Sequence, residues 1–459
     1  MSADVHSRVS PAVRETPPSD DYLEREIPLS ADALELAAAL VESPLGIDGG
    51  RPHVVYENAG TWSVALGAIA TVTVTRTTVD ARLGEKAHTV PWTGSPLPAV
   101  DDLLARIPVT RWRAYGWAGF ELAYVEAGLP ELVRDDTLLH LMVPRTEVRL
   151  TAGRALIRSL FEVDLDIAES LLTDHKSPSR RRPEPLDVTV ADADAYRESV
   201  RGAVAAIRDR RLQKVILSRV VPVPTPVDLV GTYVAGRRAN SPTRSFLLDV
   251  DGVAAAGFSP EIVVSVDAER RVTTQPLAGT RALVADDGEN DRLRSELLAD
   301  PKEVFEHAIS VKVAYDELQP LCAPGSVNVT DFMSIKPRGS VQHLASSLTG
   351  TLRPGVGNWR AFAALFPAVT ASGVPKPAAY QVIRHHEPAA RGLYSGAVVT
   401  VDADGSLDAA LVLRTIFRRD GRTWLQAGAG IVEQSTPERE FEETCEKLRS
   451  VSRHLVPAE

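Results

Sequence analysis

The sequence of 459 residues contains two cysteines, 5% aromatic residues and no apolar run long enough to cross a membrane. A membrane-spanning helix needs about 20 consecutive apolar residues. Cys322 and Cys445 are far apart and neither belongs to a CxxC pair, so the sequence indicates neither a disulfide framework nor a cysteine zinc site. These absences predict a reduced, cytoplasmic protein with no membrane association.

Positive charge is also scarce, because 51 Lys and Arg residues face 61 Asp and Glu residues and give a net charge of -10. Proteins that bind nucleic acid or anionic membranes usually present a basic surface, so neither partner is expected. A small anionic substrate stays compatible with this charge, since a few arginines can create a local anion site. Hydrophobic residues are 44% of the chain, which is typical of a globular protein with a large core.

The composition divides the chain into three segments. Residues 1–21 are polar and rich in Pro and Ser, which predicts a disordered lead that is neither a signal peptide nor a membrane anchor. Residues 22–185 consist mainly of strand patterns, and residues 186–459 mix strands with longer helices. The polar, proline-containing stretch 175–185 either links two domains or forms a surface loop within one.

Strand patterns joined by short turns recur through both halves. Residues 62–66 and 70–76 alternate or carry β-branched side chains, and residues 407–418 form another alternating run. The segment 289–321 has helical character and is interrupted near Pro301. Strands with short connections and a few inserted helices predict an α+β fold with antiparallel sheets, without βαβ winding.

Two helical segments each carry a pair of glutamates. Glu303 and Glu306 lie three residues apart, as do Glu440 and Glu443, so each pair occupies one face of its helix. Mg²⁺ prefers carboxylate oxygens, and two such pairs can hold one ion. The alternative is a solvated acidic face, which is also the expectation for the neighbouring Glu438, Glu442 and Glu446.

Two further ionisable residues are candidates for acid–base chemistry. Lys214 opens an apolar strand, where it either extends to solvent or, when desolvated, loses its proton and acts as a general base. Glu261 follows a turn in the segment GFSPE and is either a surface carboxylate or a buried, protonated general acid.

An anion site is suggested by residues of the C-terminal half. Arg414 is able to clamp a carboxylate with two hydrogen bonds or to form a cross-strand ion pair. Gly428 and Gly430 follow a strand without βαβ context, which argues against a dinucleotide fold, but glycines allow close backbone approach and offer N–H donors to anions. For His343 the commoner role is that of a buried histidine with satisfied hydrogen bonds.

Nine segments of the sequence resemble, in order, those of chorismate-utilising enzymes: KVILSR, GFSPE, QPLAGTR, KEVFEHAIS, GSVQHL, LFPAVTASGVPK, RGLYSGAVV, AGAGIV and EREFEETCEKL. This superfamily includes anthranilate, aminodeoxychorismate, isochorismate and salicylate synthases. The similarity is dense over residues 190–455 and looser from about residue 50, and it is greatest to the salicylate synthases of mycobactin-type siderophore pathways. It implies an anthranilate-synthase-component-I-like fold: two large antiparallel sheets packed as a sandwich, with helices outside, in a single integrated domain. The stretch 175–185 is then a surface loop, and residues 186–459 form the chorismate-binding region.

The resemblance also implies roles for individual residues. Lys214 corresponds to the general base that activates water for attack on C2 of chorismate, and Glu261 to the general acid that protonates the departing C4 hydroxyl. Glu306 and Glu443 correspond to direct Mg²⁺ ligands, with Glu303 and Glu440 supporting through water. The substrate-binding positions are Leu277, Ala278, Gly279, Thr280, His343, Tyr394, Arg414, Gly428, Gly430 and Lys447.

Lys214 distinguishes branches of the superfamily, since members that use ammonia have glutamine at its position and depend on a glutamine amidotransferase. The chain is therefore expected to use water and to need no amidotransferase subunit. As a separate expectation, which Lys214 does not decide, the protein is a monomer. The resemblance implies Mg²⁺-dependent conversion of chorismate through isochorismate to salicylate and pyruvate. One alternative is an isochorismate synthase that stops at isochorismate, and a second is a non-catalytic chorismate-binding protein. Gln275, where the similar enzymes have glutamate, departs from the pattern outside the catalytic positions.

Overall fold

The computed structural model describes residues 21–135, 137–175 and 179–458. Apart from Asp21, the lead predicted for residues 1–21 lies outside the described residues. None of the helices in these three ranges is both long and apolar enough to span a membrane.

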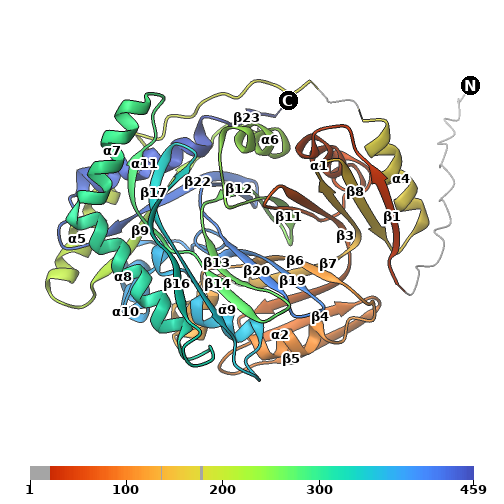
Figure 1. The fold of residues 1–459 in the computed structure, drawn as a ribbon, viewed down its shortest axis with the longest axis horizontal. Helices are drawn as coiled ribbons and strands as arrows, with labels where there is room; N and C mark the ends of the chain where they lie inside the picture. Colours follow the sequence, from red (N-terminus) through yellow and green to blue (C-terminus); the bar gives the residue numbers. More distant parts are fainter. Residues whose placement is uncertain (1–20, 136, 176–178, 459) are drawn as a thin grey trace, which may run out of the picture.

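Antiparallel strands form one hydrogen-bonded network of 21 strands that folds into two layers (Figure 1). The first layer comprises, in order of pairing, β1 (Leu23–Pro28), β8 (Arg154–Ser159), β7 (Thr137–Thr151), β3 (Thr61–Thr75), β2 (His53–Asn58), β11 (Arg244–Val250), β12 (Val253–Ser259), β21 (Thr415–Arg419), β22 (Arg422–Ile431), β9 (Lys214–Pro222) and β18 (Gly373–Val374). The second comprises β5 (Lys86–Pro91), β4 (Thr78–Leu83), β3, β7, β6 (Arg113–Ala118), β19 (Ala397–Asp402), β20 (Leu407–Leu411), β13 (Ile262–Val266), β14 (Arg271–Thr274) and β17 (Val341–Thr351), with β15 (Leu277–Ala282) and β16 (Asn328–Arg338) flanking β17. A separate pair joins β10 (Val227–Asp228) to β23 (Val456–Pro457).

The two layers are continuous because β3 and β7 belong to both. The first half of β3 pairs with β2 and its second half pairs with β4. The pairing of β3 with β7 changes register between Ala68 and Ala70, directly after Gly67, whose φ is +66°. A β-bulge with glycine in the left-handed region bends a strand and redirects it. The runs 62–66 and 70–76, which the alternating pattern separates, are therefore the two arms of one bent strand.

Apolar side chains from both layers meet in a shared core. The buried cluster between the layers contains Val54, Tyr56, Ala65, Phe246, Leu248, Val250, Val253, Ala255 and Phe417 from the first layer or the bend, and Tyr115, Trp117, Met142, Val398 and Ala410 from the second. Asp408 of β20 reaches across this interface, because it accepts a hydrogen bond of 2.7 Å from Tyr56 Oη and one of 2.6 Å from Arg244 Nε. Face-to-face packing of antiparallel sheets in this way is a sandwich.

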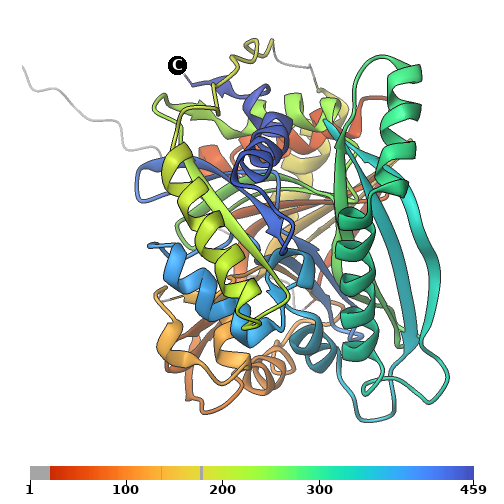
Figure 2. The same ribbon diagram turned by 90° about the vertical axis from the view of Figure 1, so that its left-hand side faces the viewer.

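Helices cover the outside of the sandwich (Figures 1 and 2). They are α1 (Ala33–Glu42), α2 (Leu97–Leu104), α3 (Leu122–Glu126), α4 (Glu162–Thr173), α5 (Ala193–Arg208), α6 (Leu229–Ala239), α7 (Asp287–Ala299), α8 (Pro301–Leu318), α9 (Asn358–Leu365), α10 (Lys376–His386) and α11 (Pro437–Ser452), with short 3₁₀ turns η1 (Ile47–Gly49), η2 (Pro130–Leu132) and η3 (Val369–Ala371). The segment 289–321 resolves into α7 and α8, which follow each other on one side of the molecule, because Asp300 ends one helix and caps the next before Pro301. The α+β sandwich predicted from the sequence is confirmed.

The stretch 175–185 contains no helix or strand among its described residues, and residues 181–185 are exposed. The chain just beyond it is anchored to the C-terminus, since the backbone N–H of Leu186 donates to the carbonyl of Ser452 at 2.9 Å. Glu184 N–H likewise donates to the carbonyl of Leu455 at 2.7 Å. Residues 176–178 lie outside the described ranges.

Candidate active site

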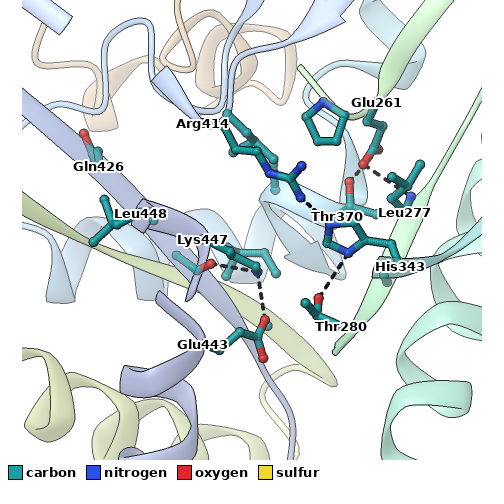
Figure 3. Close-up of a pocket in the computed structure, with 18 of the residues that line it drawn as sticks. Glu261, Leu277, Thr280, His343, Thr370, Arg414, Gln426, Glu443, Lys447 and Leu448 are labelled. Carbon is teal, nitrogen blue, oxygen red and sulfur yellow. Dashed lines mark hydrogen bonds and ion pairs between the residues drawn. The ribbon is translucent and has the colours of Figure 1, made fainter. Parts of the chain in front are cut away.

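One cavity, with about 780 Å³ of atom-free space, lies where β22, β15 and β17 meet helices α8 and α11 (Figure 3). All ten substrate-binding positions inferred from the sequence line it: Leu277, Ala278, Gly279, Thr280, His343, Tyr394, Arg414, Gly428, Gly430 and Lys447. Glu261, Glu306 and Glu443 also line it, whereas Lys214, Glu303 and Glu440 lie behind its wall.

Glu261 lies just before β13 and is buried. Thr370 Oγ1 donates to its Oε1 at 2.6 Å, and the backbone N–H of Leu277 donates to its Oε2 at 3.3 Å. Burial raises the pKa of Glu261 to about 8, although these two hydrogen bonds and the nearby charge of Lys214 act in the opposite direction. Glu261 therefore carries a proton at neutral pH, as a general acid requires.

Arg414 stands between β20 and β21 with a φ of +52°, a left-handed conformation that divides the predicted strand 407–418 into two. Its Nη1 donates to the carbonyl of Arg338 at 2.7 Å, and its Nη2 contacts His343 Nε2. Burial and the positive charge of Arg338 lower the pKa of Arg414 to about 9. In the described part of the chain no carboxylate forms an ion pair with this guanidinium, so a buried positive charge faces the cavity without a counter-ion.

His343 of β17 lies opposite Thr280 of β15 in the sheet register. Its Nδ1 is 3.3 Å from the carbonyl of Gly279 and 3.1 Å from Thr280 Oγ1. Burial and the positive charges of Arg414 and Lys447 hold its pKa well below the usual value, so the ring is neutral. With Nδ1–H donating to the Gly279 carbonyl, Nε2 is left to accept from Arg414. His343 therefore orients the guanidinium towards the cavity.

The glycines of β22 are required by close contacts. A Cβ at Gly428 would lie 2.6 Å from the carbonyl oxygen of Leu217, and a Cβ at Gly430 would lie 2.1 Å from Glu306 Oε1. Lys447 Nζ donates to the carbonyl of Gly428 at 3.0 Å and is 2.8 Å from Glu443 Oε1. Gly430 thus makes room for a carboxylate of α8 beside the strand, and Lys447 presents a cation to the same space.

Lys214 opens β9 and has a fully buried side chain. Its Nζ lies 2.9 Å from Glu306 Oε1 and donates to Ser310 Oγ at 3.2 Å. Glu306 itself lines the cavity, so it stands between Lys214 and the enclosed space. A general base must be a neutral amine, and the predicted role of Lys214 therefore requires this ion pair to open.

The four glutamates of the predicted metal site are all buried, in contrast to the exposed Glu438 of the same acidic helix. Glu303 Oε2 accepts from the backbone N–H of Thr280 at 3.0 Å, and its Oε1 accepts from Arg281 at 3.2 Å. Glu440 Oε1 accepts from Lys302 Nζ at 2.8 Å. Each of the four carboxylates thus has at least one cationic partner.

Within the described ranges, no three His, Cys, Asp or Glu side chains come close enough together to hold a metal ion. The donor set nevertheless suits Mg²⁺. Burial and the charges of Glu443 and Glu306 raise the pKa of Glu303, and burial and the charge of Glu443 raise that of Glu440 to about 7. The carboxylates therefore repel one another, which a bound divalent cation would relieve. The metal stays a prediction.

Several lining residues were not predicted from the sequence, among them Ile216, Thr370, Ala371, Leu413 and Gln426. Ile216 and Thr370 fall within two of the recognised segments, KVILSR and LFPAVTASGVPK, so the motif located them without indicating their contacts. Gln426 Nε2 donates to Ser218 Oγ at 2.9 Å on the neighbouring strand, a pairing that depends on the register of β22 with β9.

A buried acid, a guanidinium without a carboxylate partner among the described residues, and lysine-paired carboxylates surround one cavity, an arrangement that suits an enzyme acting on a small anion. The model of the chorismate binding enzyme family matches residues 51–453. The salicylate synthase of Mycolicibacterium paratuberculosis is 40% identical over 431 residues, covering 94% of this chain and 95% of that protein. The chain belongs to the family of chorismate binding enzymes.

Other relatives match more partially in sequence or share the fold. Anthranilate synthase component 1 of Thermus thermophilus is 38% identical over 266 residues, covering 58% of this chain and 57% of that one. Among solved structures, anthranilate synthase component I of Streptococcus pneumoniae has a TM-score of 0.73 at 24% identity, covering 86% of this chain and 92% of that one. The menaquinone-specific isochorismate synthase of Escherichia coli has a TM-score of 0.69 at 24% identity and covers 96% of each chain. These structures confirm the fold expected from the sequence.

Proposed function

We propose that the protein is a salicylate synthase that converts chorismate to salicylate and pyruvate through isochorismate. The observation that carries this proposal is the end-to-end similarity to a salicylate synthase, 40% identical over 94% of this chain. Lysine at position 214, where ammonia-using members of the superfamily have glutamine, supports water as the nucleophile and a chain that works without an amidotransferase subunit. A monomeric cytoplasmic enzyme that supplies salicylate for siderophore synthesis fits this function.

The charges around the cavity suit a substrate with two carboxylates. Arg414 offers a buried guanidinium that has no counter-ion among the residues that the structure describes, and Tyr394 lines the same cavity. We assign the pyruvyl carboxylate to these two residues, with backbone at Gly428 and Gly430 and the cation of Lys447 completing the anion site. His343 orients Arg414 and stays neutral beside the ring, so it adds no second positive charge next to the guanidinium.

In the first step, water attacks C2 while the C4 hydroxyl leaves. Lys214, once its ion pair with Glu306 has opened and its ammonium has lost a proton to solvent, accepts a proton from the attacking water as a neutral amine. Glu261 donates its proton to the departing oxygen, so that water enters at C2 and water leaves from C4. The raised pKa of Glu261, about 8, keeps this proton in place at neutral pH.

In the second step, isochorismate loses pyruvate within the same cavity. The hydrogen at C2 passes to the methylene carbon of the enolpyruvyl group as the C3–O bond breaks, which leaves aromatic salicylate. No acid or base is needed. The residues around the cavity restrict the substrate to the reactive conformer and exclude water.

Mg²⁺ is part of the proposal, with Glu306 and Glu443 as direct ligands and Glu303 and Glu440 supporting through water. When bound there, the ion would neutralise and anchor the ring carboxylate of the substrate. The charge of Glu443 raises the pKa of both Glu303 and Glu440, and this repulsion among buried carboxylates supports the assignment.

Incubation of chorismate with the protein and Mg²⁺ in H₂¹⁸O tests the function and the nucleophile together. We expect pyruvate and salicylate whose hydroxyl carries one ¹⁸O atom, detected by mass spectrometry. Isochorismate without pyruvate would make the protein an isochorismate synthase, and unchanged chorismate would indicate a non-catalytic binding protein. Unlabelled salicylate would contradict water addition at C2.

A further inference from the structure

Lys302 occupies an unusual position between the two glutamate-bearing helices. It is the second residue of α8, and its Nζ lies 2.8 Å from Glu440 Oε1 of α11. The same nitrogen is 3.9 Å from Glu303 Oε1 of its own helix. Its side chain is 16% exposed, while that of Glu440 is fully buried. The ammonium therefore bridges one carboxylate from each of the two glutamate pairs.

This position explains why the four carboxylates do not converge in the described structure. Glu306 is turned towards Lys214, and Glu443 towards Lys447. Glu303 and Glu440 are the members of the two pairs that lie behind the cavity wall, and Lys302 lies between them. A lysine ammonium is a compact cation with three donors, so it satisfies the carboxylate oxygens that the water ligands of a bound divalent cation would otherwise contact.

We infer that Lys302 is an internal counter-ion that competes with the hydrated divalent cation for the carboxylates of Glu303 and Glu440. In the metal-free protein it offsets the repulsion among the buried glutamates. When the metal binds, the ammonium withdraws from the space between the helices. This inference rests on the proposed Mg²⁺ site, and it makes Lys302 a residue that sets the affinity of that site.

The opposite role is that Lys302 holds Glu440 in place to support the metal. The two roles predict changes of opposite sign when the positive charge is removed. A competing charge weakens metal binding, so its removal tightens binding; a supporting residue strengthens binding, so its removal weakens it. Repulsion between cations a few ångströms apart in a partly buried site is large enough to change affinity by about tenfold or more.

Isothermal titration of substrate-free protein with MgCl₂ measures this directly. Lys302→Gln keeps a hydrogen-bond donor but removes the charge, and we expect its Kd for Mg²⁺ to be about tenfold or more lower than that of the unmodified protein. Lys302→Arg keeps the charge and should show no such tightening. Lys312→Gln is the matched control, because Lys312 is an exposed lysine of the same helix, paired with Asp316; its Kd should not change.

Thermal unfolding gives a second readout that does not depend on activity. Without Mg²⁺, Lys302→Gln should melt at a lower temperature than the unmodified protein. Saturating Mg²⁺ should raise the melting temperature of Lys302→Gln by more than it raises that of the unmodified protein. A variant that unfolds without Mg²⁺ but refolds on its addition also supports the inference, whereas one that stays unfolded in saturating Mg²⁺ contradicts it.

The outcomes separate this inference from the proposed function. Mg²⁺ binding by the unmodified protein with equal or weaker binding by Lys302→Gln overturns the role of Lys302 alone. Absence of Mg²⁺ binding in both proteins overturns the metal site as well.

Discussion

Thr370 Oγ1 donates a hydrogen bond of 2.6 Å to Glu261 Oε1, and both side chains line the cavity. The contact joins η3 to the start of β13, two elements more than 100 residues apart in sequence. It holds a protonated carboxyl group in a fixed orientation towards the substrate space. The hydroxyl also moderates the effect of burial, because it lowers the pKa that burial raises.

The pH dependence of catalysis should depend on the hydrogen bond between Thr370 and Glu261. Because Glu261 is the proposed general acid and its pKa is raised to about 8, kcat/KM should fall above that pH. Thr370→Val removes the hydroxyl, so the alkaline limb should shift to higher pH and kcat should drop by roughly tenfold through poorer positioning. The exposed Thr330→Val serves as control. An unshifted limb in Thr370→Val would show that Glu261 is not the titrating acid.

Glu261 should also make stability depend on pH. Its folded-state pKa lies above the unfolded value, so its stabilising contribution is complete below about pH 4.5 and is lost as pH rises through about 8. Glu261→Gln lacks this dependence. In urea denaturation between pH 5 and pH 8.5, the midpoint of the variant should rise relative to that of the unmodified protein, by the equivalent of a few kcal/mol at most, at roughly 1.4 kcal/mol per pKa unit. Urea midpoints that change with pH in the same way in both proteins would contradict a buried, neutral Glu261.

Arg414 should show opposite effects on binding and stability. Its buried guanidinium has no carboxylate partner in the described ranges, which costs stability until a substrate anion binds. Arg414→Met should raise KM for chorismate by about a hundredfold or more and at the same time raise the melting temperature of the free protein. Arg418→Met, on the exposed side of β21, is the control. A lower melting temperature with unchanged KM would give Arg414 a purely structural role.

Gly430 should be intolerant of a single methyl group. Alanine would place its Cβ 2.1 Å from Glu306 Oε1, so the carboxylate would have to move away from Lys214 and the cavity. We expect Gly430→Ala to remain folded by circular dichroism and to lose at least about 90% of its activity, given the cost of overpacking. Gly357→Ala is the matched control, because nothing lies within 4 Å of a Cβ at that position. Full activity of Gly430→Ala would show that Glu306 is not part of the active site.

The sequence patterns predicted which residues belong to the site, but not how those residues are arranged relative to one another. The ten substrate-binding positions line one cavity because short segments fix which side chains face the substrate. The break at Arg414 was not predicted, because it depends on a single left-handed residue inside the run 407–418, which alternates like a strand. Gly67 falls between the runs 62–66 and 70–76, and their pattern did not show that the two runs form one continuous, bent strand. The role of Lys302 was also not predicted, because it depends on the tertiary contact between the first turn of α8 and Glu440 of α11.

A time course of chorismate turnover with Mg²⁺, followed by proton NMR, tests the proposed salicylate synthase activity most directly. We expect isochorismate to appear transiently and then to be consumed, while salicylate and pyruvate rise together in equal amounts until chorismate is exhausted. Isochorismate that reaches a constant ratio with chorismate, without any pyruvate, would contradict a salicylate synthase.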